Sequence, residues 1–265
     1  MVHIKSIREL DCMRVSGRLV SQVLQRIAKM VEPGISLLDL DREAEKLTLG
    51  FGAIPAFKGY LGYKHSLCTS VNEQIVHGIP TDRRLIEGDL VGLDFGLVFN
   101  GFYGDSALTV PVGKISPVAR DLARVTLESL YSGIAAARSG NSIKDIALAI
   151  EGTVTPKGYG IVREFVGHGI GNKLHEDPQV ANYSAGASSL KLKTGMTIAI
   201  EPMINAGKCD VRILEDKWTA VTKDGSLSAH FEHTIAITDG EPEILTEWEN
   251  PRFGIFYEKG EAGNV

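Results

Sequence analysis

The pair Asn100-Gly101 is the strongest hairpin signal in this chain, and it lies between two strand-like runs, residues 89–99 and 102–110. A two-residue turn that matches the twist of its strands needs positive φ angles at both central positions, which Asn and Gly adopt readily. Turn type and loop length together fix the pairing register of a hairpin. The sequence therefore predicts two long antiparallel strands in a single register, around which the rest of the fold must be built.

This register places two aspartates on one face of the hairpin. Gly96 faces Asp105, and Asp94 lies two residues before Gly96 and therefore points the same way. Diagonal neighbours of this kind have Cβ atoms roughly 7–8 Å apart or less. The residues around Asp94 are apolar enough to bury it, and buried carboxylates need a shared proton, a cationic partner or a metal ion. The alternative is a polar edge face that carries two solvated aspartates.

Two pairs of helix-like segments indicate that the chain is built from two similar halves. Apolar residues at a helical period, with start signals at Ser36 and Ser142, predict helices over about 7–31, 36–50, 118–137 and 142–155. Identical residues recur at a constant offset, a period too long for a solenoid but suited to one fold with internal pseudo-twofold symmetry. The recurring pairs are Gly34 and Gly140, Ser36 and Ser142, Asp39 and Asp145, Glu45 and Glu151, and Gly52 and Gly158.

Strand candidates follow each helix pair. They are residues 66–72, 89–99, 102–110, 161–167, 196–203, 209–214, 218–222 and 228–238. A tail from about Thr246 contains Trp248, Phe253, Phe256 and Tyr257 among polar residues. This tail either packs on the body of the protein or contacts a partner.

Three more residues are candidates for the site that the aspartates indicate. Glu201 follows an apolar run and precedes Pro202, which must end the strand or place it at an edge, and Glu232 heads another apolar run. Charged residues are disfavoured inside such strands unless they are paired. His168 lies between two glycines, which remove bulk and let the imidazole project into a site that also admits a ligand. A satisfied polar histidine is the alternative.

Together the five residues form a set of ligands rich in oxygen. Four carboxylates and one imidazole offer too many ligand atoms for one tetrahedral zinc ion. They suit two divalent ions, and the oxygen-rich set favours Mn or Fe over a thiolate-bound metal. Two such ions can lower the pKa of a bridging water and polarise a carbonyl, which is hydrolytic chemistry. The set is Asp94, Asp105, His168, Glu201 and Glu232.

Composition excludes several other classes of protein. The 265 residues are within reach of one large α/β unit, and a net charge of −5 does not suggest a general nucleic-acid binder. The start of the chain has no apolar core of a secretory signal, and no apolar stretch approaches the ~20 residues that span a bilayer. The three cysteines are scattered, so we expect reduced thiols rather than a disulfide framework.

The ordered set of ligands resembles the five-ligand site of the pita-bread metallopeptidases, and within them the type I methionine aminopeptidases. The resemblance covers roughly residues 5–245 and implies an α/β (α+β) fold: two pseudo-symmetric halves with a central curved antiparallel sheet covered by helices. It implies one catalytic domain over 1–265, with halves of about 8–110 and 118–240 and a tail of about 246–265. Supporting stretches are Asn72–Pro80 (NEQIVHGIP), Phe165–Tyr183 with GHGIG and HEDPQV, Met196–Ile204 (MTIAIEPMI) and Ser226–Thr234 (SLSAHFEHT).

The resemblance also implies an activity. It indicates a metallo-aminopeptidase that hydrolyses N-terminal methionine from nascent proteins and peptides, prefers a small second residue, and uses water activated by two divalent ions (Mn, Fe or Co). It implies a cytoplasmic monomer without nucleic-acid specificity or membrane attachment, with the ribosome as a candidate partner. Asp94 would chelate one ion and Asp105 and Glu232 would bridge both, while His168 and Glu201 would bind the second.

Further roles follow from the same resemblance. Glu201 would help to move the proton of the nucleophilic water. His77 would contact the substrate and stabilise the tetrahedral intermediate or the leaving amine, and His175 would hydrogen-bond on the side of the scissile carbonyl. The methionine pocket would be lined by Phe57, Tyr60, Tyr63, Cys68, His77, Leu174, His175 and Trp218. A monovalent cation, Na or K, would lie near Asn72, Gln74 and Ser228.

Three positions depart from the family pattern. Phe57 stands where many relatives have Cys, Leu174 where many have Phe, and His230 where Gln is common. His230 shares a strand face with Glu232, so it would reach the metal shell, lie just outside it, or be solvated.

Two rival functions stay open. A proline-directed relative such as a prolidase usually carries an extra N-terminal domain, and a non-catalytic binding module of this fold would have lost ligands.

Overall fold

The computed structural model describes residues 2–249, and four α-helices within them confirm the predicted helices to within a few residues at each end. Each helix begins directly after a serine. The serine hydroxyl, or the acidic residue three positions on, bonds to backbone groups that the first helical turn leaves free. The helices are α1 (Ile7–Ala28), α2 (Leu37–Gly50), α3 (Pro117–Ala136) and α4 (Ile143–Val154).

Within the described residues, nine strands form one antiparallel sheet. Its main path runs β1-β4-β5-β14-β9-β7-β8, while β2 pairs with β4 and β15 with β14. The strands are β1 (Ile54–Pro55), β2 (Cys68–Val71), β4 (Leu90–Phe99), β5 (Phe102–Pro111), β7 (Gly167–Gly169), β8 (Glu176–Val180), β9 (Thr197–Ile200), β14 (Glu232–Ala236) and β15 (Glu243–Ile244).

Two smaller sheets lie beside this one. The first has the order β13-β10-β6 and the second β11-β12-β3. Their strands are β3 (Gln74–Val76), β6 (Gly160–Ile161), β10 (Met203–Asn205), β11 (Val211–Ile213), β12 (Ala220–Thr222) and β13 (Ser228–His230). Short 3₁₀ turns cover Tyr60–Gly62, Thr155–Lys157 and Ser184–Gly186.

The hairpin formed by β4 and β5 has the predicted register. Gly96 pairs with Asp105, and Asn100 and Gly101 have φ angles of 50° and 81°. These two positive angles are the ones that the twist of a two-residue hairpin requires. The turn chemistry of two residues therefore sets the position of every side chain along the two longest strands.

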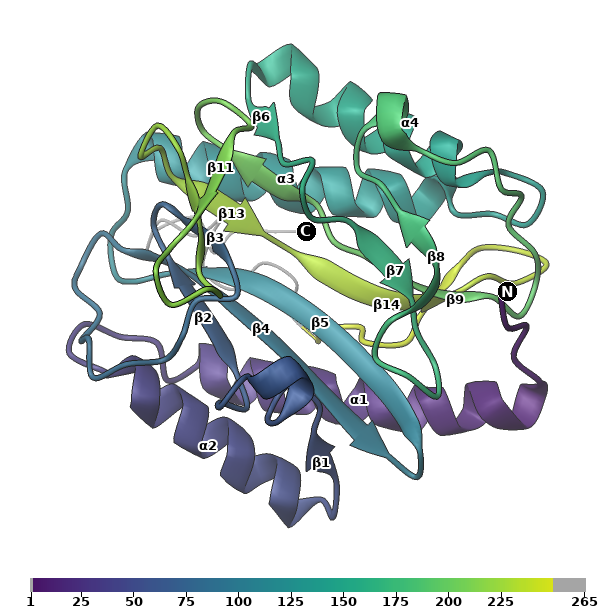
Figure 1. Ribbon diagram of the computed structural model, residues 1–265, viewed down its shortest axis with the longest axis horizontal. Coiled ribbons are helices and arrows are strands. Elements are labelled where there is room, and N and C mark those ends of the chain that lie inside the picture. Colours follow the sequence, from purple (N-terminus) through teal and green to yellow (C-terminus); the bar gives the residue numbers. More distant parts are fainter. Residues whose placement is uncertain (1, 250–265) are drawn as a thin grey trace, which may run out of the picture.

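Helix α1 covers one face of this hairpin, and the candidate ligands lie on the other. A Cβ added at Gly104 on β5 would come within 3.1 Å of the backbone nitrogen of Gly17 in α1. Successive strand residues point to opposite faces, so Asp105 points away from α1. Figure 1 shows α1 and α2 along the part of the sheet that contains β4, and α3 and α4 along the part that contains β9 and β14. The large buried core lies between these helices and the sheet.

The two helix pairs start in the same way. Ser36 and Ser142 each donate from Oγ to the acid three residues later, Asp39 and Asp145, at 2.6 Å. Each serine also forms an isolated antiparallel bridge with a residue about 50 positions on, Ser36 with Arg84 and Ser142 with Lys191. The recurrence of residues along the sequence thus has a counterpart in local structure.

Three predicted strands are wrong in their extent. The run 161–167 is not one strand, because β6 ends at 161 and β7 begins at 167 in another sheet. The run 196–203 divides at Glu201-Pro202, where Pro202 has no N–H to donate. The run 228–238 divides at Phe231, where the chain passes from the small sheet of β13 to the large sheet of β14.

The predicted tail is partly described. Thr246 and Trp248 are buried, and the Trp248 ring packs on His233 with 3.9 Å between ring centroids. Residues 246–249 therefore pack on the body, whereas Phe253, Phe256 and Tyr257 lie outside the described residues. No helix among residues 2–249 is both long and apolar enough to cross a lipid bilayer.

Candidate metal centre

Five neighbouring strands of the large sheet each bring one predicted ligand to the same place. The strands lie in the order β4, β5, β14, β9 and β7. Four of the residues are on their strands, and Glu201 directly follows the last residue of β9. In strand order the residues are Asp94, Asp105, Glu232, Glu201 and His168, so a set scattered over more than 130 positions of sequence becomes one row across a sheet.

The register of three strands aligns the carboxylates. Asp94 on β4 and Glu232 on β14 both pair with Ala107 on β5, one from each side. Asp105 lies two residues before Ala107 and therefore points to the same face. The small side chain of Ala107 leaves the space above this part of the sheet to the three acids.

The ligand atoms lie close enough to share a cation. One atom from each of Asp105, His168 and Glu232 lies within 4.8 Å of the other two, and all three residues are buried. The Nε2 atom of His168 is 3.7 Å from Oε1 of Glu201. These distances bring four of the five predicted ligands into reach of a common centre.

Three of the carboxylates have a buried oxygen without a hydrogen-bond partner in the part of the chain that the structure describes. Among the described residues, Asp94 Oδ1, Asp105 Oδ1 and Glu232 Oε1 accept no hydrogen bond. Burial raises the pKa of Asp94 to about 7, and burial together with repulsion from the neighbouring acids raises the pKa of Asp105, Glu201 and Glu232. A divalent cation would supply the missing partner, and this oxygen-rich donor set is one that such ions take, so the residues present fit a metal.

His168 is held in the tautomer that metal binding requires. Its Nδ1 lies 2.9 Å from the carbonyl oxygen of Gly169, which can only accept, so Nδ1 carries the proton. Nε2 is then free of a proton and faces Glu201. Burial, and next the neighbouring His175, lower the pKa of His168 to about 3, so the ring is neutral at physiological pH. A hydrogen bond of this kind typically orients a ligating histidine.

His230 lies against Glu201 rather than in solvent. Strand β13 ends at His230 and β14 begins at Glu232 in another sheet, so the two side chains do not share one continuous strand. The solvated alternative is wrong, because His230 is 3% exposed and its Nε2 lies 3.6 Å from Oε2 of Glu201. Burial lowers the pKa of His230 to about 3.

A cavity of about 350 Å³ opens over the ligands. This volume suits a small molecule or one large side chain. All eight residues predicted to contact the substrate line it, together with four carboxylates and His168. The wall is continuous with a second buried apolar cluster that includes Phe57, Tyr63, Cys68 and Leu174, with Trp218 packed against it.

His77 is held in the cavity wall by an unusual backbone and by two rings. Its φ angle is 60°, a left-handed conformation that a residue other than glycine rarely adopts outside special sites. The ring centroid lies 5.2 Å from that of Phe165 and 6.4 Å from that of Trp218. Burial, and next His175, lower the pKa of His77 to about 4, so its imidazole is neutral.

His175 is oriented by a tyrosine. The hydroxyl of Tyr60 lies 2.7 Å from Nδ1 of His175, and the ring of His175 lies 4.3 Å from that of His168 between centroids. Burial lowers the pKa of His175. Two neutral imidazoles, His77 and His175, thus line the cavity beside the ligands.

The cavity is also lined by five residues that the sequence analysis did not indicate as substrate contacts. Phe165 was placed inside a predicted strand, whereas it lies in the loop before β7 and packs on His77. Leu61 is 80% exposed and has a φ angle of 48°. It lies between Gly59 and Gly62, which also have positive φ angles, and these two glycines were the sequence signal of an exposed turn. The set is Leu61, Val76, Glu164, Phe165 and Val166.

The residues predicted near a monovalent cation lie together, but their side-chain oxygens have protein partners. Oδ1 of Asn72 accepts from the backbone N–H of Leu90 at 2.9 Å, and Oε1 of Gln74 accepts from that of Val71 at 2.8 Å. The backbone N–H of Ser228 donates to the carbonyl oxygen of Asn72 at 2.8 Å. The cation role of these residues stays a prediction.

Comparison of the sequence with known proteins finds one family and many close relatives. The model of metallopeptidase family M24 matches residues 11–239. Methionine aminopeptidase 1 of Bacillus subtilis is 49% identical over 246 residues, which are 93% of this chain and 99% of that protein. The methionine aminopeptidase of Escherichia coli is 43% identical over 247 residues, 92% of this chain and 94% of that protein.

Solved structures agree with this result. The crystal structure of methionine aminopeptidase from Thermotoga maritima matches with a TM-score of 0.91 and 43% identity, over 93% of this chain and all of that one. Prolidase from Pyrococcus furiosus matches with a TM-score of 0.74 and 25% identity, over 93% of this chain but 66% of that one. These likenesses confirm the predicted pita-bread fold.

Proposed function

The chain belongs to metallopeptidase family M24, and we propose that it removes the N-terminal methionine from proteins and peptides by hydrolysis. Its relatives over nearly their full lengths are methionine aminopeptidases, and a prolidase is matched over only part of its own length. The observation that carries the proposal is a row of four carboxylates and one imidazole in the lining of an aromatic cavity, with Asp105, Glu232 and His168 buried and the other two half-buried.

We propose that the metal is a pair of divalent ions, with Mn, Fe or Co as candidates. Asp94, Asp105, His168, Glu201 and Glu232 would hold them, and three of these acids have buried oxygens that lack a partner among the described residues. Asp105 and Glu232 come from β5 and β14, which pair directly with each other inside the row, and this suits their use by both ions. When bound, such a pair polarises a carbonyl and lowers the pKa of a water.

The residues of the chain itself would position the substrate and move protons. Glu201, which lines the cavity, would take a proton from the attacking water and pass it to the leaving amine. Neutral His175 would donate to the scissile carbonyl from Nε2, in the tautomer whose Nδ1 accepts from the Tyr60 hydroxyl 2.7 Å away. Neutral His77 would stabilise the tetrahedral intermediate or the leaving amine from its strained position in the wall.

The cavity suits a methionine side chain. Phe57, Tyr63, Cys68, Leu174 and Trp218 provide an apolar wall, and the rings of Tyr63 and Trp218 meet edge to face at 5.0 Å. A thioether packs well against aromatic edges. We propose a small second residue in the substrate, because the same cavity of about 350 Å³ is lined by the apolar wall, by His77 and His175 and by the ligand residues.

The remaining proposals concern the protein as a whole. We propose that it works as one catalytic domain made of two similar halves, as a monomer in the cytoplasm on nascent chains. A monovalent ion, Na or K, would lie near the carbonyl oxygen of Asn72, and the ribosome is a candidate partner.

A direct assay tests the activity. Purified protein is supplied with Mn, Fe or Co and with Met-Ala-Ser, and release of methionine is measured. A dipeptide with proline in the second position serves as the parallel substrate. Methionine release supports the proposal, turnover of the proline dipeptide alone would show a prolidase, and no turnover with any metal would indicate a binding module.

A further inference from the structure

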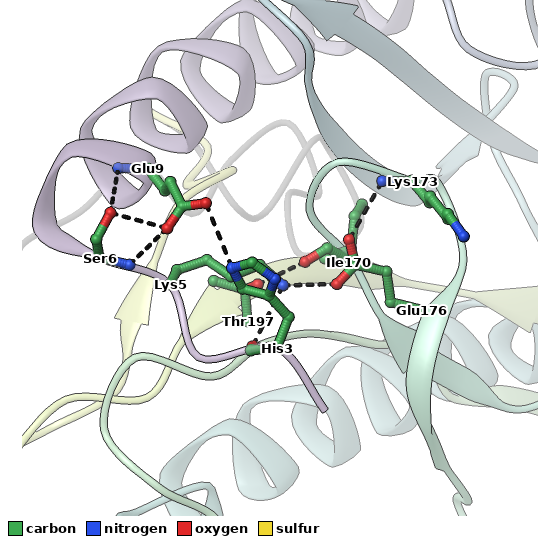
Figure 2. Close-up of polar contacts among 8 residues, drawn as sticks. All are labelled: His3, Lys5, Ser6, Glu9, Ile170, Lys173, Glu176 and Thr197. Atoms are coloured by element: carbon green, nitrogen blue, oxygen red, sulfur yellow. Dashed lines mark hydrogen bonds and ion pairs between the residues drawn. The ribbon is translucent and has the colours of Figure 1, made fainter. Parts of the chain in front are cut away.

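A buried ion pair links the start of the chain to the loop that carries His175. The Nζ atom of Lys5 lies 2.6 Å from Oε2 of Glu176, and the Lys5 side chain is 2% exposed. Lysine is seldom buried this far unless its charge is paired. Figure 2 shows the Lys5 side chain extending from the N-terminal segment to the Glu176 carboxylate.

The pair fastens the loop from Ile170 to His175. The second oxygen of Glu176, Oε1, accepts from the backbone N–H of Lys173 at 3.2 Å. A Cβ at Gly171 would come within 2.4 Å of Cε of Lys5 and 2.7 Å of Oε1 of Glu176, so the pair lies directly on the loop backbone. The ion pair therefore fills the inside of the loop and braces its far end.

Other contacts fix both ends of this link to the body of the protein. The backbone N–H of Lys5 donates to the carbonyl oxygen of Gly195 at 2.7 Å. The near end of the loop is held by Thr197, whose hydroxyl donates to the carbonyl oxygen of Ile170 at 2.5 Å (Figure 2), and by the N–H of Tyr103, which donates to Gly171. The far end of the loop is held by Glu176, by burial of Leu174 in the second apolar cluster, and by Tyr60, whose hydroxyl lies 2.7 Å from Nδ1 of His175.

The anchoring of Glu176 restrains its neighbour His175. Glu176 is the first residue of β8, and His175 immediately precedes it. His175 itself lies in the bend before the strand, and a single peptide bond joins it to Glu176. With Glu176 held by Lys5, the backbone next to His175 is held too, and the His175 ring meets Tyr60 and His168 in the cavity wall.

We propose that Lys5 and Glu176 are a positioning pair that sets the imidazole of His175 in the cavity wall. The inference rests on the proposed function for the role of His175. The N-terminal segment then acts on turnover without touching the substrate, through one ion pair that leads to one imidazole.

The test compares variants of the metal-loaded full chain. Lys5→Met keeps most of the length of the side chain but removes its charge. Misplacing a group that contacts substrate typically costs about 10- to 100-fold in kcat. We expect that loss in kcat with metal content unchanged, and recovery of most of it in Lys5→Arg. Lys46→Met, which breaks an exposed ion pair with Glu43 on α2, is the matched control and should leave kcat unchanged.

A double-mutant cycle separates this role from a merely structural one. If the pair acts through His175, adding Lys5→Met to His175→Ala should change kcat by no more than about twofold, because coupled residues are not additive. Equal losses in the presence and absence of His175, or loss of bound metal, would overturn the proposal. If Lys5→Met does not fold, Glu176→Gln replaces it in the same double-mutant cycle. The amide oxygen of the glutamine can still accept from the backbone N–H of Lys173.

A spectroscopic readout does not depend on turnover. In metal-free protein labelled with ¹⁵N-histidine, the ring signals of His175 are assigned from their absence in His175→Ala. We expect these signals to shift or broaden in Lys5→Met and to be unchanged in Lys46→Met. An unaltered His175 spectrum in Lys5→Met would refute the positioning role, whereas failure of the wild-type protein to release methionine would refute only the proposed activity.

Discussion

Asp94 and Glu232 pair with the same residue, Ala107, from the two strands that flank it. Two acids more than 130 positions apart are thereby placed side by side on one face of a sheet, with Asp105 two residues along the strand between them. Sheet register, which is among the most rigid features of a protein, thus sets the geometry of the proposed metal centre. A change that shifts this register or crowds this face should weaken metal binding.

Gly96 gives the most local test of that crowding. A Cβ at Gly96 would lie 3.2 Å from Oδ1 of Asp105 and 3.1 Å from Phe57, so Gly96→Ala should push the carboxylate aside. We expect metal affinity to fall by about tenfold, as for other changes behind a metal ligand. Isothermal titration with Mn measures this. Gly92→Ala on the same strand, where the nearest atom would be 3.5 Å away, should bind normally, and equal affinities for the two variants would contradict the account.

Glu201 should be needed both for metal and for turnover. Glu201→Ala removes a ligand and the proposed proton shuttle, so we expect kcat to fall by at least about 10³-fold and metal content to drop. Steady-state kinetics on Met-Ala-Ser, with elemental analysis of the same sample, measure both. Near-native activity of this variant would show that another group moves the proton.

His77 should affect turnover alone. Its ring packs on Phe165 and Trp218 in the cavity wall, and it is not in the row of ligands. His77→Ala should lower kcat by about 10²-fold while the protein keeps its full metal content. Loss of metal together with activity would show that His77 supports metal binding and does not act on the substrate alone.

The buried acids predict how the metal-free protein responds to pH. The pKa of Asp94 is raised to about 7, above its ordinary value of 3.8, and those of Asp105, Glu201 and Glu232 are raised too. The lowered pKa values of the buried histidines act the other way, because at those rings the unfolded chain holds protons more tightly until both states are neutral above about pH 7. At the four acids the folded state holds protons more tightly than the unfolded chain. This stabilisation is complete below the unfolded pKa values and is lost as pH rises through the folded ones.

Thermal unfolding of metal-free protein between about pH 7 and about pH 9, where the histidines are neutral in both states, measures the effect of the acids. We expect Tm to fall as pH rises across that range, and added Mn at the upper end to restore it, because the cation replaces the protons. Asp94→Asn, which cannot ionise, is the matched control and should show a smaller fall. A Tm that is flat in pH for the metal-free wild type would contradict the buried, partner-poor acids.

Local chemistry explains which parts of the fold could be predicted. Asn100-Gly101 fixed the register of β4 and β5, and serine caps marked the starts of helices, because both signals act within a few residues. The short strands β1, β3, β8 and β15 escaped notice, since two to five residues are too few to show a period. The break at Phe231 depends on which sheet each side joins, which is a long-range property.

The residues of the site likewise fall into those that the sequence could predict and those that it could not. The carboxylates stood out because a charge inside an apolar strand is unusual at any position, and Glu201 and Glu232 are of this kind. His230 against Glu201, and Lys5 against Glu176, could not be predicted, because each contact joins elements that only the fold brings together. An isolated lysine near the start of a chain has no sequence signal of burial.

The most direct test is a crystal structure of the protein grown with Mn, with anomalous scattering used to locate the ions. The account predicts two Mn peaks above β4, β5, β14, β9 and β7, with ligands from Asp94, Asp105, His168, Glu201 and Glu232. No Mn peak at these side chains, or a peak elsewhere in the chain with this row of residues unligated, would contradict it.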